Sequence, residues 1–169
     1  KAFMYGFESL IETNLLTLLG NDPQNIKFNI FLNTALTGSR YLESEIPGVT
    51  NNEVEFVPLI NLKTGLNFGF KDFLGSLQYT YVSKQFTDAS NAAQNPFDNQ
   101  NGIRGEIPSY DIVDLSVSYS WRYFTLESGI NNLLDSWYFT RRATGYPGPG
   151  IIPSPPRTYY LTLQFKIGS

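Results

Sequence analysis

The residues with the clearest chemical potential are arginines in stretches rich in turn-forming residues. Arg141 and Arg142 are adjacent and directly precede the Gly/Pro-rich run at 145–150. A guanidinium is permanently charged, and its planar set of donors can hold two carboxylate oxygens at once. Adjacent positions in such a loop can aim one guanidinium at a ligand while the neighbour packs back against the protein. The sequence therefore favours anion binding by this pair.

Other polar stretches hold further candidates. Arg40, Arg104 and Arg157 lie in or beside long polar segments, and Tyr146 begins a Tyr-Pro-Gly-Pro-Gly run that shapes a turn or presents Tyr146 to a ligand. The alternative for any one arginine is an ordinary solvated charge, or a contact with phosphates at a membrane rim. The predicted ligand-binding residues are Arg40, Arg104, Arg141, Arg142 and Tyr146.

The composition removes most catalytic and metal-binding chemistry. The chain has no cysteine and no histidine, which excludes thiolate and imidazole metal sites and catalytic schemes built on either residue. Only catalysis by carboxylates or lysine remains possible, and no motif in the sequence supports it. The Asp/Asn-rich stretch at 88–101 does not match the spacing of a calcium loop, so it is predicted as an ordinary polar loop. We expect no enzyme activity, no cofactor and no metal site.

The elements that position these residues are strands with a period of two. Near the C-terminus, Leu161, Leu163 and Phe165 alternate with Thr162 and Gln164. A short helical turn at 15–19, ended by Gly20, follows the first strand, for which a helix over 7–19 is the alternative. The predicted strands cover residues 2–13, 26–36, 58–70, 73–86, 110–121, 124–131 and 159–167.

In six of the seven predicted strands, a charged side chain identifies one face as wet, because an apolar environment would penalise the charge. These residues line a path or pair with neighbouring protein, and the second role is favoured. They are Glu8, Lys27, Lys63, Asp114, Glu127 and Lys166.

Aromatic residues gather where the shortest connections are expected, as in a girdle at a lipid interface. The alternative is that the same aromatic residues form the core of a soluble β-sandwich. These residues are Phe70, Phe73, Trp121, Tyr123 and Phe124.

The connections alternate in length. Those at 71–72 and 122–123 are minimal, whereas those at 38–55, 88–108 and 134–156 are long. This pattern predicts an antiparallel up-and-down meander with short turns at one end, the asymmetry of bacterial outer-membrane barrels. Charged residues make up only 16% of the chain, against about 25% in globular proteins, so part of the surface faces something other than water. The net charge of −3, without a basic run, argues against a nucleic-acid partner.

The expected sheet has about seven strands, an odd number, whereas bacterial barrels have even numbers. Open sheet edges are very costly in hydrocarbon, because each unpaired backbone group there costs several kcal/mol. We therefore predict that residues 1–169 are part of a larger barrel.

The order of residues near the C-terminus resembles the final hairpin of TonB-dependent outer-membrane receptors, especially the ferric dicitrate type. The chain reads Gly-Ile-Asn-Asn-Leu-Leu-Asp at 129–135, Tyr-Phe at 138–139 and Arg-Arg-Ala-Thr-Gly-Tyr-Pro-Gly-Pro-Gly at 141–150, followed by the closing amphipathic strand. The resemblance spans essentially the whole chain and is strongest from Val82 onward. One departure is the end: family barrels usually finish on an aromatic residue, whereas Phe165 here precedes Lys-Ile-Gly-Ser.

The resemblance implies an all-β transmembrane barrel of the 22-stranded type, with 1–169 as its C-terminal segment and the plug domain outside this chain. It implies a receptor in the bacterial outer membrane that takes up an iron chelate, either ferric citrate or a siderophore, by energy coupling. The expected partners are the ferric chelate, outer-membrane lipid and lipopolysaccharide, the receptor's own plug and remaining strands, and the TonB complex through the missing N-terminal part.

Two other functions fit the residues. A surface protein that does not transport, such as an adhesin or a peptide-binding barrel, shares the membrane-spanning pattern, and a plug domain upstream in the gene distinguishes the two. A soluble all-β binding module with an aromatic core is the third possibility, and it predicts that the purified chain needs no detergent.

Overall fold

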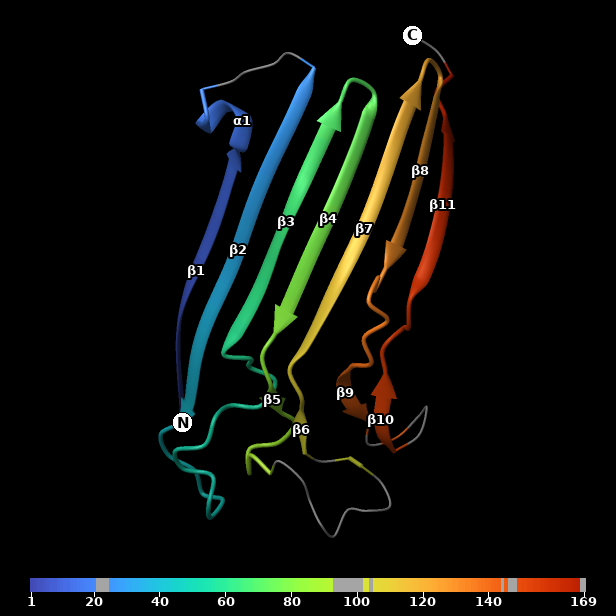
Figure 1. Ribbon diagram of the computed structural model, residues 1–169. Helices are drawn as coiled ribbons and strands as arrows, with labels where there is room; N and C mark the ends of the chain where they lie inside the picture. The colour runs from blue at the N-terminus through green and yellow to red at the C-terminus, as the bar shows by residue number, and fades with distance from the viewer. Residues whose placement is uncertain (21–24, 93–101, 104, 144, 146–148, 168–169) are drawn as a thin grey trace.

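The computed structural model describes residues 1–20, 25–92, 102–103, 105–143, 145 and 149–167. Its main feature is one seven-stranded antiparallel sheet in which the long strands lie side by side in chain order (Figure 1). This arrangement confirms the predicted meander. The strands are β1 (Ala2–Asn14), β2 (Ile26–Tyr41), β3 (Ile60–Phe70), β4 (Phe73–Val82), β7 (Tyr110–Trp121), β8 (Phe124–Asn131) and β11 (Thr158–Phe165).

The two ends of the sheet differ, as the connection lengths predicted. The end of β11 and the β3–β4 and β7–β8 turns lie at one end, called here the turn end (Figure 1). Each turn has a basic first residue with positive φ, Lys71 at 52° and Arg122 at 52°. The Lys71 ammonium lies 5.4 Å from the centre of the Phe70 ring, and the Arg122 guanidinium lies 5.4 Å from the Trp121 ring. Cations and aromatic rings thus meet where a lipid interface is expected.

The first connection at the turn end contains the predicted helical turn, α1 (Leu15–Leu18). The Asn14 side chain caps it by accepting hydrogen bonds from the backbone N–H groups of Leu16 at 3.0 Å and Thr17 at 3.4 Å. Gly20, with φ of 78°, follows the helical turn. The alternative of a helix over 7–19 is wrong, because β1 continues to Asn14. No helix among the described residues is long and apolar enough to cross a membrane.

The period of two extends across the whole sheet. Leu77 of β4 is opposite Leu66 of β3 and Leu115 of β7, and Leu115 is in turn opposite Ile130 of β8. On this apolar face the side chains stay open, with Leu161 exposed by 71%. Val49, Val82 and Ile107 are the only buried hydrophobic residues among those described. A soluble sandwich would cover this face with a second sheet. The apolar side chains stay exposed, so no sheet in the described part of the chain covers them.

Several boundaries differ from the sequence prediction. β2 continues through Gly38 to Tyr41, although Gly38 was predicted to open a loop. Gly38 is the direct cross-strand partner of Tyr5, and a Cβ at Gly38 would collide with the Tyr5 ring. The glycine therefore makes room for an aromatic neighbour within a strand and does not form a turn.

Three short strands also form within segments predicted as loops, and a fourth, β5 (Gln85–Phe86), lies in the predicted strand 73–86, whose part in the main sheet ends at Val82. They need partners from distant parts of the chain, so local periodicity does not reveal them. The other three are β6 (Glu106–Ile107), β9 (Phe139–Ala143) and β10 (Gly150–Pro153).

Two glycine–aromatic pairs occur on the polar face. Phe31 is opposite Gly65, and Tyr160 is opposite Gly129. In both pairs the ring occupies the space that a Cβ on the glycine would need. The ring of each aromatic residue therefore lies against the backbone of the neighbouring strand.

The Gly-Ile-Asn-Asn-Leu-Leu-Asp motif forms the end of β8. Asn132 is only 3% exposed and has a φ of 55°. Its backbone N–H donates to Asp114 Oδ1 at 2.9 Å, its Nδ2 donates to the Ser136 carbonyl at 3.0 Å, and its Oδ1 accepts from the Ser136 N–H at 2.8 Å. One buried side chain thus sets the direction in which the chain leaves the sheet.

The assignment of faces can be tested on β4. Leu77→Arg places a charge at the middle of the apolar face and is expected to destabilise the folded protein by about 2–4 kcal/mol in lipid. Gln78→Arg is the control, because it places the same group on the polar face opposite Asp114. Denaturant unfolding of the intact protein in lipid vesicles measures both. Similar losses for the two variants would show that the faces are misassigned.

The role of the strand-end motif can be tested with adjacent asparagines. Asn132→Ala removes a buried amide that makes two hydrogen bonds to Ser136 and is expected to lower the free energy of unfolding by about 1–3 kcal/mol. Asn131→Ala removes only an exposed bond to Thr158 Oγ1 at 3.2 Å, so a change within about 0.5 kcal/mol is expected. Thermal and denaturant unfolding give both values. An Asn132 variant as stable as the Asn131 variant would contradict this role.

Candidate ligand-binding surface

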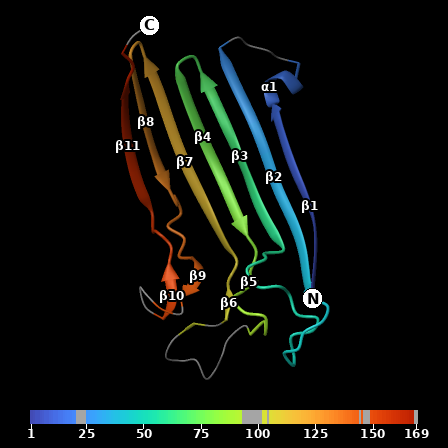
Figure 2. The ribbon, with the colours of Figure 1, turned by 180° about the vertical axis from the view of Figure 1, so that it is seen from behind.

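Three long connections lie at the end of the sheet opposite the turns, together with the N-terminus (Figure 2). They span residues 42–59, 83–109 and 132–157 and are called here the first, second and third loops. Among the described residues, Arg141 and Arg142 belong to the third loop, and Arg40 lies just before the first loop. The loop end is therefore the candidate site.

The first and second loops are joined by asparagine side chains. Asn91 Nδ2 donates to the Glu53 carbonyl at 2.9 Å, and the Glu53 N–H donates back to Asn91 Oδ1 at 2.7 Å. Asn52 Nδ2 donates to the Ala89 carbonyl at 2.8 Å. An amide side chain that both donates to and accepts from one backbone residue imitates a pair in a β-ladder. The two loops therefore pack as one unit.

The base of the second loop is closed by the β5–β6 pair. Thr87 Oγ1 donates to the Gly105 carbonyl at 2.6 Å and accepts from the Gly105 N–H at 3.1 Å. Lys84 Nζ lies 3.7 Å from Glu106 Oε2. Ile107, next in β6, is completely buried. These contacts fix the segment around residues 105–107.

The third loop contains the β9–β10 hairpin. Tyr138 stacks on Tyr110 of β7, with ring centres 4.8 Å apart, and so places the hairpin against the sheet. Near the return to β11, the Arg157 N–H donates to Asp135 Oδ1 at 2.9 Å. The predicted arginine pair lies on β9.

Arg142 crosses from the third loop to the second. Its Nη1 donates to the Gly102 carbonyl at 2.8 Å, and its Nη2 donates to the Glu106 carbonyl at 3.0 Å. The guanidinium carbon lies 5.2 Å from the centre of the Phe139 ring. Its Nε is buried and has no hydrogen-bond partner among the described residues. This guanidinium packs back against the protein, as one member of the pair was expected to do.

Arg141 differs from its neighbour. It is exposed, its partner in the β9–β10 ladder is Ile152, and its side chain forms no hydrogen bond or ion pair with any residue that the structure describes. A charge held on a strand and left without a protein partner is available to a ligand.

The other predicted site residues do not join this pair. Arg40 is exposed at the end of β2, opposite Phe3, and lines a hollow of about 490 Å³ together with Tyr5 and Glu53. Strands β3, β4 and β7 separate β2 from β8, which leads into the third loop. Arg104 and Tyr146 lie outside the described residues.

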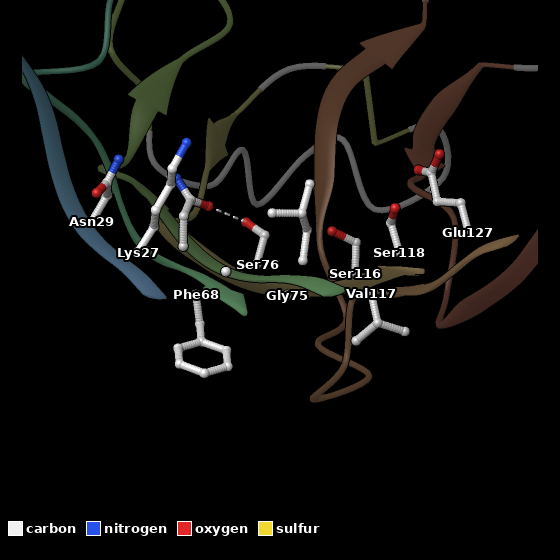
Figure 3. A pocket seen from close by; sticks show the side chains of 12 residues that line it. Lys27, Asn29, Phe68, Gly75, Ser76, Ser116, Val117, Ser118 and Glu127 are labelled. Atoms are coloured by element: carbon white, nitrogen blue, oxygen red, sulfur yellow. Dashed lines mark hydrogen bonds between the residues drawn. The ribbon is translucent and has the colours of Figure 1, made fainter. Parts of the chain in front are cut away.

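A second hollow, on the concave polar face toward the turn end, did not emerge from the sequence. It has a volume of about 330 Å³. Lys27, Ser76, Ser118 and Glu127 point into it, whereas Phe68 projects from the opposite face (Figure 3). The sequence placed Lys27 and Glu127 on the wet face, but this assignment did not indicate a hollow. In the described part of the chain, no group of three or more acidic residues is placed to hold a metal ion.

Comparison with known proteins identifies the fold. A family model described as "TonB dependent receptor-like, beta-barrel" matches residues 1–133, and no curated protein sequence matches the chain. The unliganded ferric citrate transporter FecA has a TM-score of 0.83 and 24% identity, over 97% of this chain and 24% of that one. The ferric yersiniabactin uptake receptor FyuA from Yersinia pestis has a TM-score of 0.73 and 18% identity, over 97% of this chain and 23% of that one.

The siderophore receptor PiuA from Acinetobacter baumannii is similar in the same way, with a TM-score of 0.70 and 19% identity, over 97% of this chain and 22% of that one. The chain thus spans about a quarter of the length of these solved structures. The family match covers most of the sheet, and the seven-stranded meander has the same fold as the receptor barrels. This chain belongs to the TonB-dependent receptor β-barrel family.

Proposed function

We propose that this chain forms part of the barrel of a bacterial outer-membrane receptor that takes up an iron chelate by energy coupling, with ferric citrate as the leading cargo. The family supports the receptor class. The similar structures named for ferric citrate, ferric yersiniabactin and siderophore support the cargo class. The observation that carries the choice of an anionic chelate is Arg141, an exposed guanidinium at the loop end.

The two faces of the sheet suit a barrel wall. The open apolar face contacts the hydrocarbon of the outer membrane, and the polar face lines the interior. The outer edges of β1 and β11 pair with the remaining strands of the barrel, because hydrocarbon leaves no backbone group unpaired. The hollow between Lys27 and Glu127 faces the plug, and TonB acts through parts of the receptor outside this chain.

The loop end suits recognition of an anion. Ferric citrate carries carboxylates, and an arginine fork binds a carboxylate through two parallel hydrogen bonds. Arg141 supplies this fork in the proposed site, and Arg104 and Tyr146 remain predicted contacts. Arg40, near Phe3 and Tyr5 at the other side of the loop end, is predicted to meet the ligand or the phosphates of lipopolysaccharide.

The proposal predicts how Arg141→Gln changes binding by the full-length receptor. Loss of a charged hydrogen bond is expected to weaken ferric citrate binding by about 10- to 150-fold. Added salt should weaken the wild type more than the variant, because part of the attraction between charges is screened. Isothermal titration calorimetry measures both effects.

Two comparisons make this test specific. Arg122→Gln removes a similar charge at the turn end and should leave ferric citrate binding unchanged. A neutral siderophore should be insensitive to Arg141→Gln. Unchanged binding of ferric citrate by the Arg141 variant would place the ligand contacts elsewhere in the receptor.

A further inference from the structure

We propose that Arg142 is a positioning residue for ligand capture, which couples the second loop to the third loop and does not itself contact the ligand. The coupling is argued from geometry alone. Its effect on binding rests on the proposed function. The inference separates the roles of two adjacent arginines: Arg141 meets the ligand, and Arg142 holds the surface from which Arg141 projects.

The acceptors of Arg142 explain why an arginine is needed. The Gly102 and Glu106 carbonyls belong to one short segment of the second loop, and each takes a hydrogen bond from a different terminal nitrogen of the same guanidinium. Only a planar fork reaches two acceptors at once with fixed geometry, whereas a lysine ammonium is a single point of attachment. Arg142 therefore fixes the positions of Gly102 and Glu106 relative to β9.

The backbones of the two loops also approach closely beside this contact. A Cβ on Gly102 would lie 3.7 Å from Gly150 Cα, 3.9 Å from the Ile151 nitrogen and 3.7 Å from Arg142 Nη1. Gly102 has a φ of 55°, a conformation that side chains disfavour. Gly102 of the second loop thus lies against the start of β10, and Arg142 binds the carbonyl of the same glycine.

The guanidinium of Arg142 is poorly placed to bind a ligand as well. Its two terminal nitrogens already donate to backbone carbonyls, and one side stacks on Phe139. The remaining donor, Nε, is buried. Arg141 is exposed and has no such contacts with described residues, so the ligand-binding charge of the pair resides there.

Arg142 completes a series of contacts across the loop end. Asn91 and Asn52 join the first loop to the second, Thr87 closes the second loop on Gly105, and Arg142 joins the second loop to the third. Loss of Arg142 should therefore release the third loop from the other two without disturbing the contact between Asn91 and Glu53.

Hydrogen–deuterium exchange of the full-length receptor without ligand tests the coupling. Arg142→Gln is expected to increase exchange about tenfold or more in peptides covering 102–107 and 139–143, because it removes two charged hydrogen bonds. The peptide containing Glu53 should be unchanged. Arg141→Gln, the adjacent exposed arginine, is the control and should alter none of these peptides. Unchanged exchange at 102–107 in the Arg142 variant would overturn the coupling.

Ferric citrate binding by the same receptor tests the positioning role. Arg142→Gln should weaken binding, and Arg142→Lys should weaken it similarly, because lysine keeps the charge but lacks the fork. A covalent link should then restore binding in the Arg142→Gln background. Gly102→Cys and Ile151→Cys, joined by a short bis-thiol reagent, supply this link in a segment that has no other cysteine. The same cysteine pair with Arg142 intact measures any effect of the two substitutions themselves.

The outcomes distinguish the alternatives. Wild-type binding by Arg142→Lys, or weakened Arg142→Gln binding that the covalent link does not restore, would show that Arg142 acts on the ligand by its charge and would overturn the positioning role. Full binding by Arg142→Gln would overturn it as well. A wild-type receptor that binds no ferric citrate would contradict the proposed function, and the exchange measurement would still decide the coupling.

Discussion

The structure depends on one constraint: each strand must form all its backbone hydrogen bonds sideways, with the next strand, because hydrocarbon offers no other partner. The long strands, which are 8 to 16 residues in length, meet this requirement by antiparallel pairing in chain order. Since the backbone is satisfied laterally, side chains are free to divide between two environments. The sheet therefore needs no hydrophobic core of its own, and few of its apolar side chains are buried.

This constraint explains why the strands of the sheet could be predicted from the sequence. Alternation at Leu161, Leu163 and Phe165 identifies a strand locally, and the two-residue connections at Lys71 and Arg122 leave no geometry except a hairpin. Gly20 marked the end of the helical turn for the same reason, since the signal that ends a helix acts over a few residues. The Asn14 cap at its start was found only in the structure. Gly38 misled the prediction, because its role is set by Tyr5, a residue of another strand.

The loop end was less predictable. The arginine pair could be identified by residue type, but nothing local distinguishes Arg141 from Arg142. Their difference arises because Gly102 and Glu106, about forty positions earlier in the chain, supply the acceptors for Arg142. Asn91 and Glu53 likewise meet across 38 positions. Contacts of this kind depend on how the strands bring their loops together. The pattern of residues within one segment therefore does not predict them.

The glycine–aromatic pairs of the polar face bear on the space inside a barrel. Phe31 lies over Gly65 and Tyr160 over Gly129, so these large rings rest on the backbone of the next strand and do not stand upright. In a barrel, rings that lie flat on the sheet leave the interior wide. They still cover the backbone beneath them. A side chain as small as a methyl group at either glycine would tilt its ring inward. Two positions without side chains thus govern the clearance between this part of the wall and whatever occupies or crosses the interior.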